Sequence, residues 1–124
     1  MTTGTLSKLS AAIEVVTGVL LIASPGLVAR ILLSAPLADP GVAVGRLCGV
    51  ALLSLGLACW PNASATTAQA TRALFTYNLL AAFYLGYLRV GAGFVSYLLW
   101  PACVLHALLA GLLARPVYET CRHE

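Results

Sequence analysis

The stretch LSKLSAAIEVVTGVLLIA, residues 6–23, decides the fold class of this chain. It is long and apolar enough for one membrane crossing, because a hydrocarbon core of about 30 Å needs roughly 20 helical residues. The rest of the chain resembles it: of 124 residues 60% are hydrophobic and 9% are charged, whereas soluble domains carry about 25% charged residues. We therefore predict an all-α integral membrane protein.

Three further segments have similar length and hydropathy. The sequence predicts transmembrane helices over about 6–24, 41–60, 72–89 and 93–114. None of them alternates apolar and polar residues, which argues against a transmembrane barrel. We expect a four-helix transmembrane bundle that forms a single membrane domain over residues 1–124.

The connections add two expectations. Ser24 can cap a new helix with Pro25 at its first position, so a short interfacial helix is predicted over about 26–34. The stretch RVGAG, residues 89–93, is so short that the third and fourth spans must form an antiparallel hairpin. Pro116 is expected to end the fourth span.

The basic residues indicate an orientation. The side that holds both termini carries Lys8, Arg72, Arg115 and Arg122, and the other side carries Arg30 and Arg89, with Arg46 just inside it. This bias favours cytoplasmic termini in a bacterial inner membrane. The net charge of +3 is thus a topology signal, and without a clustered basic face it indicates no nucleic-acid partner.

Three polar residues lie at similar depth in different spans. Counted from the terminal side at 1.5 Å per residue, Glu14, Asn78 and His106 fall roughly 9–12 Å into the membrane. Each continues a row of small or polar residues, which is typical of faces that pack against other helices in lipid. These side chains are candidates for one polar layer. Arg46 enters from the opposite side and either extends outward or reaches toward Glu14.

Glu14 has three open interpretations. A carboxylate at the centre of a membrane helix costs about 2.5–3.5 kcal/mol, so it needs a partner, a proton or a function. The first span could be shifted so that Glu14 lies at the headgroups. It could instead pair structurally with Asn78, His106 or Arg46, or it could form a proton or substrate site.

The second span contains a row of small residues, Gly45, Gly49 and Gly56. Gly45 and Gly49 form a GxxxG pair, which allows another helix backbone to approach closely. We expect these glycines to pack within the chain, with a homodimer seam as the alternative.

Two resemblances bear on these residues. The segment IEVVTG around Glu14, in a chain of this size, resembles the small multidrug resistance transporters, which implies a carboxylate that binds protons and cationic drugs in turn and an antiparallel dimer. Arg46 and Pro101 depart from that family's pattern.

The segment GRLCGVALLSLGLACW, residues 45–60, resembles the DoxX-like group of small bacterial four-helix membrane proteins. That resemblance implies fold and location but little mechanism.

The motifs of common enzymes are missing from the sequence. It has no Gly-rich phosphate loop, nucleophile turn or paired-histidine metal motif, so we expect no catalytic residues and no cofactor. Cys103 and His106 could form half of a metal site, but further ligands at suitable spacing are lacking and no metal is expected. Tyr77 is interpreted as a core or interfacial aromatic residue.

These observations predict a non-enzymatic accessory or structural membrane component with a buried polar layer. The expected partners are the lipid bilayer and either a second copy of the chain or other membrane proteins. The alternative is a proton-coupled exporter of small molecules that uses Glu14.

Overall fold

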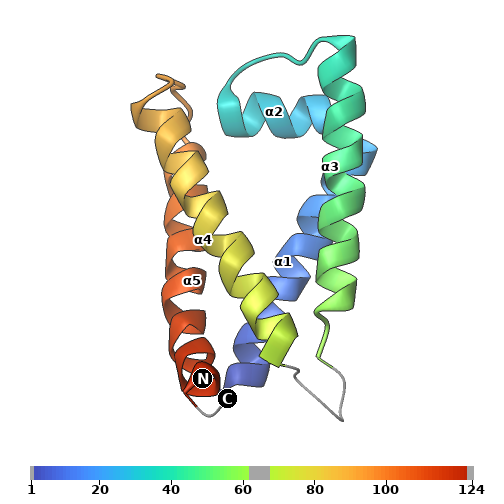
Figure 1. Ribbon diagram of the computed structural model, residues 1–124. Helices are drawn as coiled ribbons and strands as arrows, with labels where there is room; N and C mark the ends of the chain where they lie inside the picture. The colour runs from blue at the N-terminus through green and yellow to red at the C-terminus, as the bar shows by residue number, and fades with distance from the viewer. Residues whose placement is uncertain (1, 62–67, 123–124) are drawn as a thin grey trace.

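The described chain is helical. A computed structural model describes residues 2–61 and 68–122, and these form five helices and no strand. The helices are α1 (Thr3–Ala23), α2 (Pro25–Leu33), α3 (Asp39–Ala58), α4 (Ala68–Val90) and α5 (Leu99–Cys121) (Figure 1). The all-α fold class is confirmed.

Three of these helices are long and apolar enough to cross a membrane: α1, α3 and Leu99–Glu119 of α5. These helices confirm the membrane character of the chain. The helix α4 is as long as α5, at 23 residues, but Asn78 and three tyrosines lower its hydropathy and it does not belong to this set.

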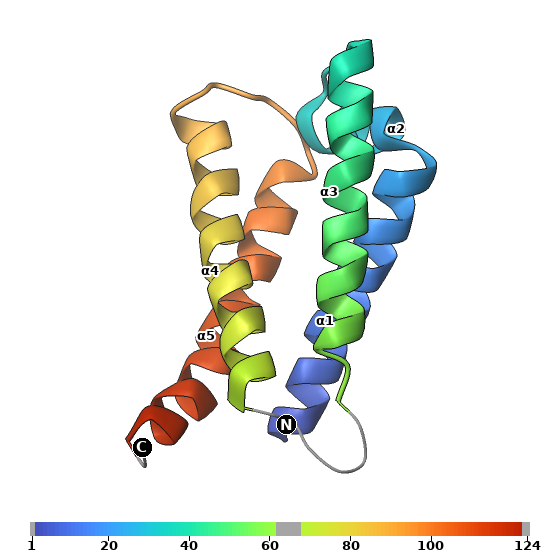
Figure 2. The same ribbon diagram turned by 45° about the vertical axis from the view of Figure 1, so that its right-hand side comes forward.

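The long helices form two antiparallel pairs, α1 with α3 and α4 with α5 (Figure 1). The pairs meet at the end that holds both termini, where Leu6, Cys59, Leu74 and Leu113 form a buried apolar cluster. They diverge toward the other end, where α2 lies across the space between them (Figures 1 and 2).

Glycines set the close contact between α1 and α3. A Cβ atom added at Gly49 would lie 2.8 Å from the carbonyl oxygen of Gly18, and one at Gly56 would lie 2.7 Å from that of Ala11. Gly45 faces the first residue of α2 at a similar distance. Because α1 and α2 of the same chain cover this row, the row does not lie open to a second copy.

The fourth predicted span begins later than expected. Residues 93–98 form a loop, in which Gly93 adopts a left-handed conformation with φ of +72°. The helix α5 begins at Leu99. Pro101 therefore lies in the first turn of α5, where the missing N–H has no intrahelical partner to lose.

The same span also ends later than expected. Pro116 lies inside α5, which continues to Cys121, so the prediction that Pro116 ends the helix is wrong. A proline removes one backbone hydrogen bond and bends a helix without necessarily stopping it. The last turns of α5 accordingly bend away from α4 (Figure 2).

Candidate functional site

A chain of hydrogen bonds joins three helices through Asn78. The Asn78 side-chain nitrogen donates to the Ser10 hydroxyl and to the Leu74 carbonyl, both at 2.8 Å. The Asn78 side-chain oxygen accepts from His106 Nδ1 at 2.8 Å. Asn78 is fully buried, and these bonds use both amide protons and the amide oxygen. The polar chain Ser10–Asn78–His106 thus links α1, α4 and α5.

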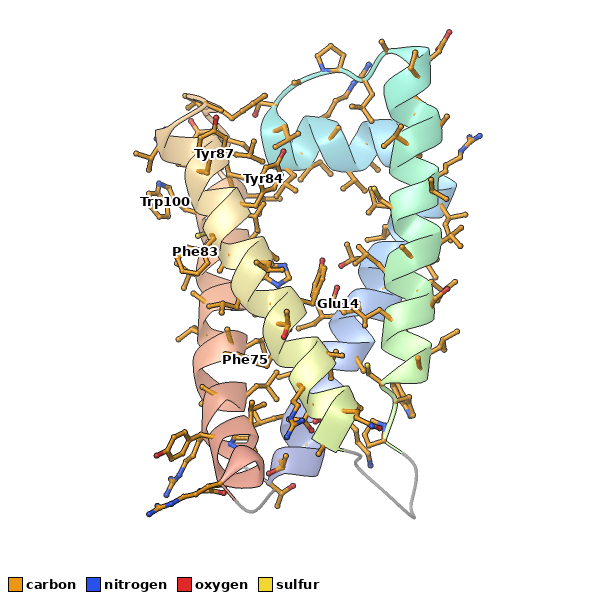
Figure 3. All side chains as sticks on the ribbon, in the orientation of Figure 1. Glu14, Phe75, Phe83, Tyr84, Tyr87 and Trp100 are labelled. Carbon is orange, nitrogen blue, oxygen red and sulfur yellow. The ribbon has the colours of Figure 1, made fainter. Side chains whose placement is uncertain are left out.

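Glu14 lies one helical turn beyond Ser10 on α1 and has a different environment. Its side chain is fully buried, and among the residues that the structure describes neither carboxyl oxygen has a hydrogen-bond partner of standard geometry. The Tyr77 hydroxyl is close enough to interact with it electrostatically but does not form a hydrogen bond of standard geometry. Figure 3 shows Glu14 between α1 and α4. An unpaired charge in such a place is costly, which favours a neutral carboxyl group.

This placement bears on the three interpretations of Glu14. Glu14 lies near the middle of the 21-residue α1 and is buried. The shifted first span that would place Glu14 at the headgroups does not form, because α1 ends at Ala23 and a separate helix begins at Pro25. Arg46 is exposed on α3 and makes no hydrogen bond to Glu14. The structure brings Glu14, Asn78 and His106 into one region and leaves Arg46 outside it.

Two further residues belong to this region. Ser10 precedes Glu14 by four positions and therefore shares its helix face, which is a signal that sequence reasoning could have used for a bonding role. Tyr77 contacts the His106 ring edge-on, with ring centroids 5.8 Å apart. The sequence places Tyr77 next to Asn78 but gives no signal that the Tyr77 hydroxyl approaches Glu14.

A cavity of about 560 Å³ adjoins the polar region between the two helix pairs. Residues of α1, α2, α4 and α5 line it, and most of them are apolar. Its polar lining residues are Thr17, Tyr77, Tyr84 and His106. Tyr84 lies toward the α2 end of α4 (Figure 3).

No protein-family model, curated protein or solved structure matches this chain. The resemblances to the DoxX-like group and to the small multidrug resistance transporters thus rest on the quoted residues alone.

Cys103 and His106, the two candidate metal ligands, form hydrogen bonds within the protein. The Cys103 thiol donates to the carbonyl of Ala82 at 3.3 Å, and His106 Nδ1 donates to Asn78. Within the two described ranges, no three His, Cys, Asp or Glu side chains lie close enough together to hold a metal ion. The polar side chains of this region can form hydrogen bonds, and the Glu14 carboxyl group can bind a proton in an apolar interior.

Proposed function

We propose that all four long helices cross a bacterial inner membrane, with both termini in the cytoplasm. The length of α4 supports this, since 23 residues exceed the roughly 20 that a crossing needs. Asn78, the most polar side chain in the middle of α4, is hydrogen-bonded inside the protein and does not have to face lipid.

The protein then acts as a non-enzymatic accessory component of the membrane. The observation that carries this proposal is the polar chain Ser10–Asn78–His106, in which Asn78 is satisfied by groups from three helices. A buried amide bonded in this way specifies one arrangement of the helices. A small scaffold with a defined outer surface can bind another membrane protein or a second copy.

Site-specific photo-crosslinking in living cells tests the accessory role. A photoreactive amino acid is placed in turn at Leu47, Phe83 and Leu108, exposed positions on α3, α4 and α5. We expect one of these faces to give a protein adduct of fixed mass and the others to give lipid adducts alone. Lipid adducts at all three positions would contradict the proposal.

Glu14 favours a second candidate function, a proton-coupled exporter. Its two unpaired oxygens lie in an apolar interior near a cavity, and such a carboxyl group can take up or release a proton as a substrate binds. A structural carboxyl group would be expected to have more hydrogen-bond donors around it than the nearby Tyr77 hydroxyl.

Transport in liposomes tests this candidate. The purified chain is reconstituted, a pH gradient is imposed, and movement of the lipophilic cation ethidium is followed by fluorescence. The exporter predicts movement that Glu14→Gln abolishes and that Glu119→Gln, at an exposed carboxylate, leaves unchanged. Gradient-driven movement that persists in Glu14→Gln, or its absence with the native chain, would exclude Glu14-dependent export of this probe.

A further inference from the structure

The cavity between the helix pairs has the dimensions of a small-molecule site. Its volume of about 560 Å³ falls within the range of roughly 300–1,000 Å³ that is typical of ligand pockets. Among the residues described by the structure, no Asp, Glu, Lys or Arg side chain lines it. Glu14 is not part of the lining, so the cavity offers a cation no direct carboxylate partner.

The polar groups of the lining recognise a specific chemistry. His106 donates from Nδ1 to Asn78, so a neutral ring keeps Nε2 as a hydrogen-bond acceptor. The hydroxyls of Tyr77 and Tyr84 can donate as well as accept. A hydroxyl group is the simplest ligand group that can both donate to a histidine nitrogen and accept from a phenol.

The helix α2 forms one wall of the cavity and is held there. Val28, Ile31 and Leu32 contribute to the lining. The Ser96 hydroxyl, from the loop before α5, donates to the carbonyl of Ile31 at 2.7 Å. This bond ties α2 to the α4–α5 pair, so the wall belongs to the folded structure.

We propose that this cavity binds a neutral amphiphile, with an apolar chain or ring body and one hydroxyl group. The body contacts the aliphatic walls from α1, α2, α4 and α5, and the hydroxyl group bonds within the set Tyr77, Tyr84 and His106. Tyr77 adjoins both the site and Glu14, but Glu14 does not line this site, so the site does not depend on proton binding at Glu14 or on contacts with other membrane proteins.

Photolabelling tests the proposal. The full chain in lipid nanodiscs is irradiated with an octanol analogue that carries a diazirine group, and the adducts are located by mass spectrometry. We expect adducts on the less exposed cavity residues Tyr77 and Leu85, and we expect excess 1-octanol to suppress them. Adducts at lipid-facing positions such as Val44 and Leu57 should not respond to the competitor.

Matched variants distinguish binding from partitioning into lipid. Ala81→Phe fills the cavity, whereas Ala51→Phe adds the same ring at an exposed position on α3. Cavity adducts should disappear in the first variant and persist in the second. Ala102→Phe, also in the lining, replaces Ala81→Phe if that variant does not fold. Cavity labelling that octanol does not suppress, or that the filled variants retain, would overturn the proposal, because lipid chains would then account for it.

Discussion

Two fully buried polar residues in the interior, Glu14 and Asn78, differ in how completely their polar atoms are hydrogen-bonded. Asn78 has a partner for each polar atom of its amide, whereas both oxygens of Glu14 lack one. Removing a hydrogen-bonded group leaves its buried partners unpaired, which costs free energy. Removing a buried group that has no hydrogen bonds does not carry this cost. Similar substitutions at the two positions should therefore change stability in opposite directions.

Glu14→Met should stabilise the protein. Methionine has a similar shape and removes a buried carboxyl group that forms no hydrogen bond of standard geometry with the described residues, so we expect the free energy of unfolding to rise by about 1–3 kcal/mol. Thermal unfolding in detergent measures this, with Glu119→Met as an exposed control. A lower melting temperature for Glu14→Met would show that the carboxyl group has a stabilising partner.

Asn78→Leu should destabilise the protein. The substitution leaves the Ser10 hydroxyl and His106 Nδ1 without their partner in an apolar interior, at an expected cost of about 2–4 kcal/mol. The double variant with Ser10→Ala should lose less stability than the sum of the two single variants, because these residues share one bond. Additive losses would contradict a direct Ser10–Asn78 interaction.

At the scale of the helices, the α1–α3 contact depends on the absence of side chains. Gly49→Ala places a methyl group 2.8 Å from the carbonyl oxygen of Gly18, and we expect a loss of about 1–3 kcal/mol. Gly111→Ala on α5 is the control, since a Cβ atom there meets nothing within 4 Å and alanine favours a helix by up to about 1 kcal/mol. Equal melting temperatures for the two variants would contradict the close contact.

The attachment of α2 can be measured separately. Ser96→Ala removes the bond to the Ile31 carbonyl, which is worth about 1 kcal/mol, so the amides of α2 should exchange with solvent about fivefold faster. Hydrogen exchange of α1 and α3 serves as the internal control and should not change. Unchanged exchange in α2 would show that the contacts of α2 with α1 and α3 are sufficient to hold it in place without the Ser96 bond.

The whole molecule consists of two helix pairs that meet near the termini and separate toward α2 (Figure 1). With four crossings both termini lie on one side, whereas with three crossings, α4 remaining outside the membrane, they lie on opposite sides. The number of crossings therefore decides where the C-terminus is.

Reporter fusions distinguish these arrangements. Alkaline phosphatase fused after Pro36 or Ala92 should be active, because both positions follow an outward crossing in the four-span arrangement. A fluorescent protein fused to the C-terminus should fluoresce in the cytoplasm. An active phosphatase at the C-terminus would contradict four crossings.

The sequence by itself determined the properties that are local to one helix. Hydropathy and length predicted α1, α3 and α4 to within about four residues of their observed bounds, because a bilayer requires about 20 apolar residues in succession. The cap signal of Ser24 and Pro25 predicted the short α2 to within one residue. The constant rise per residue placed Glu14, Asn78 and His106 at one depth, and the structure brings these residues together.

Only the tertiary structure decided which surfaces meet. A helical period identifies a face but not the neighbour that covers it, so the sequence left open whether Glu14 pairs with Arg46, Asn78 or His106, or with none of them. The structure pairs Asn78 with Ser10 and His106, turns Arg46 outward and places α1 on the glycines of α3. The cavity exists because two helix pairs diverge around α2, and that divergence depends on contacts between residues far apart in the chain.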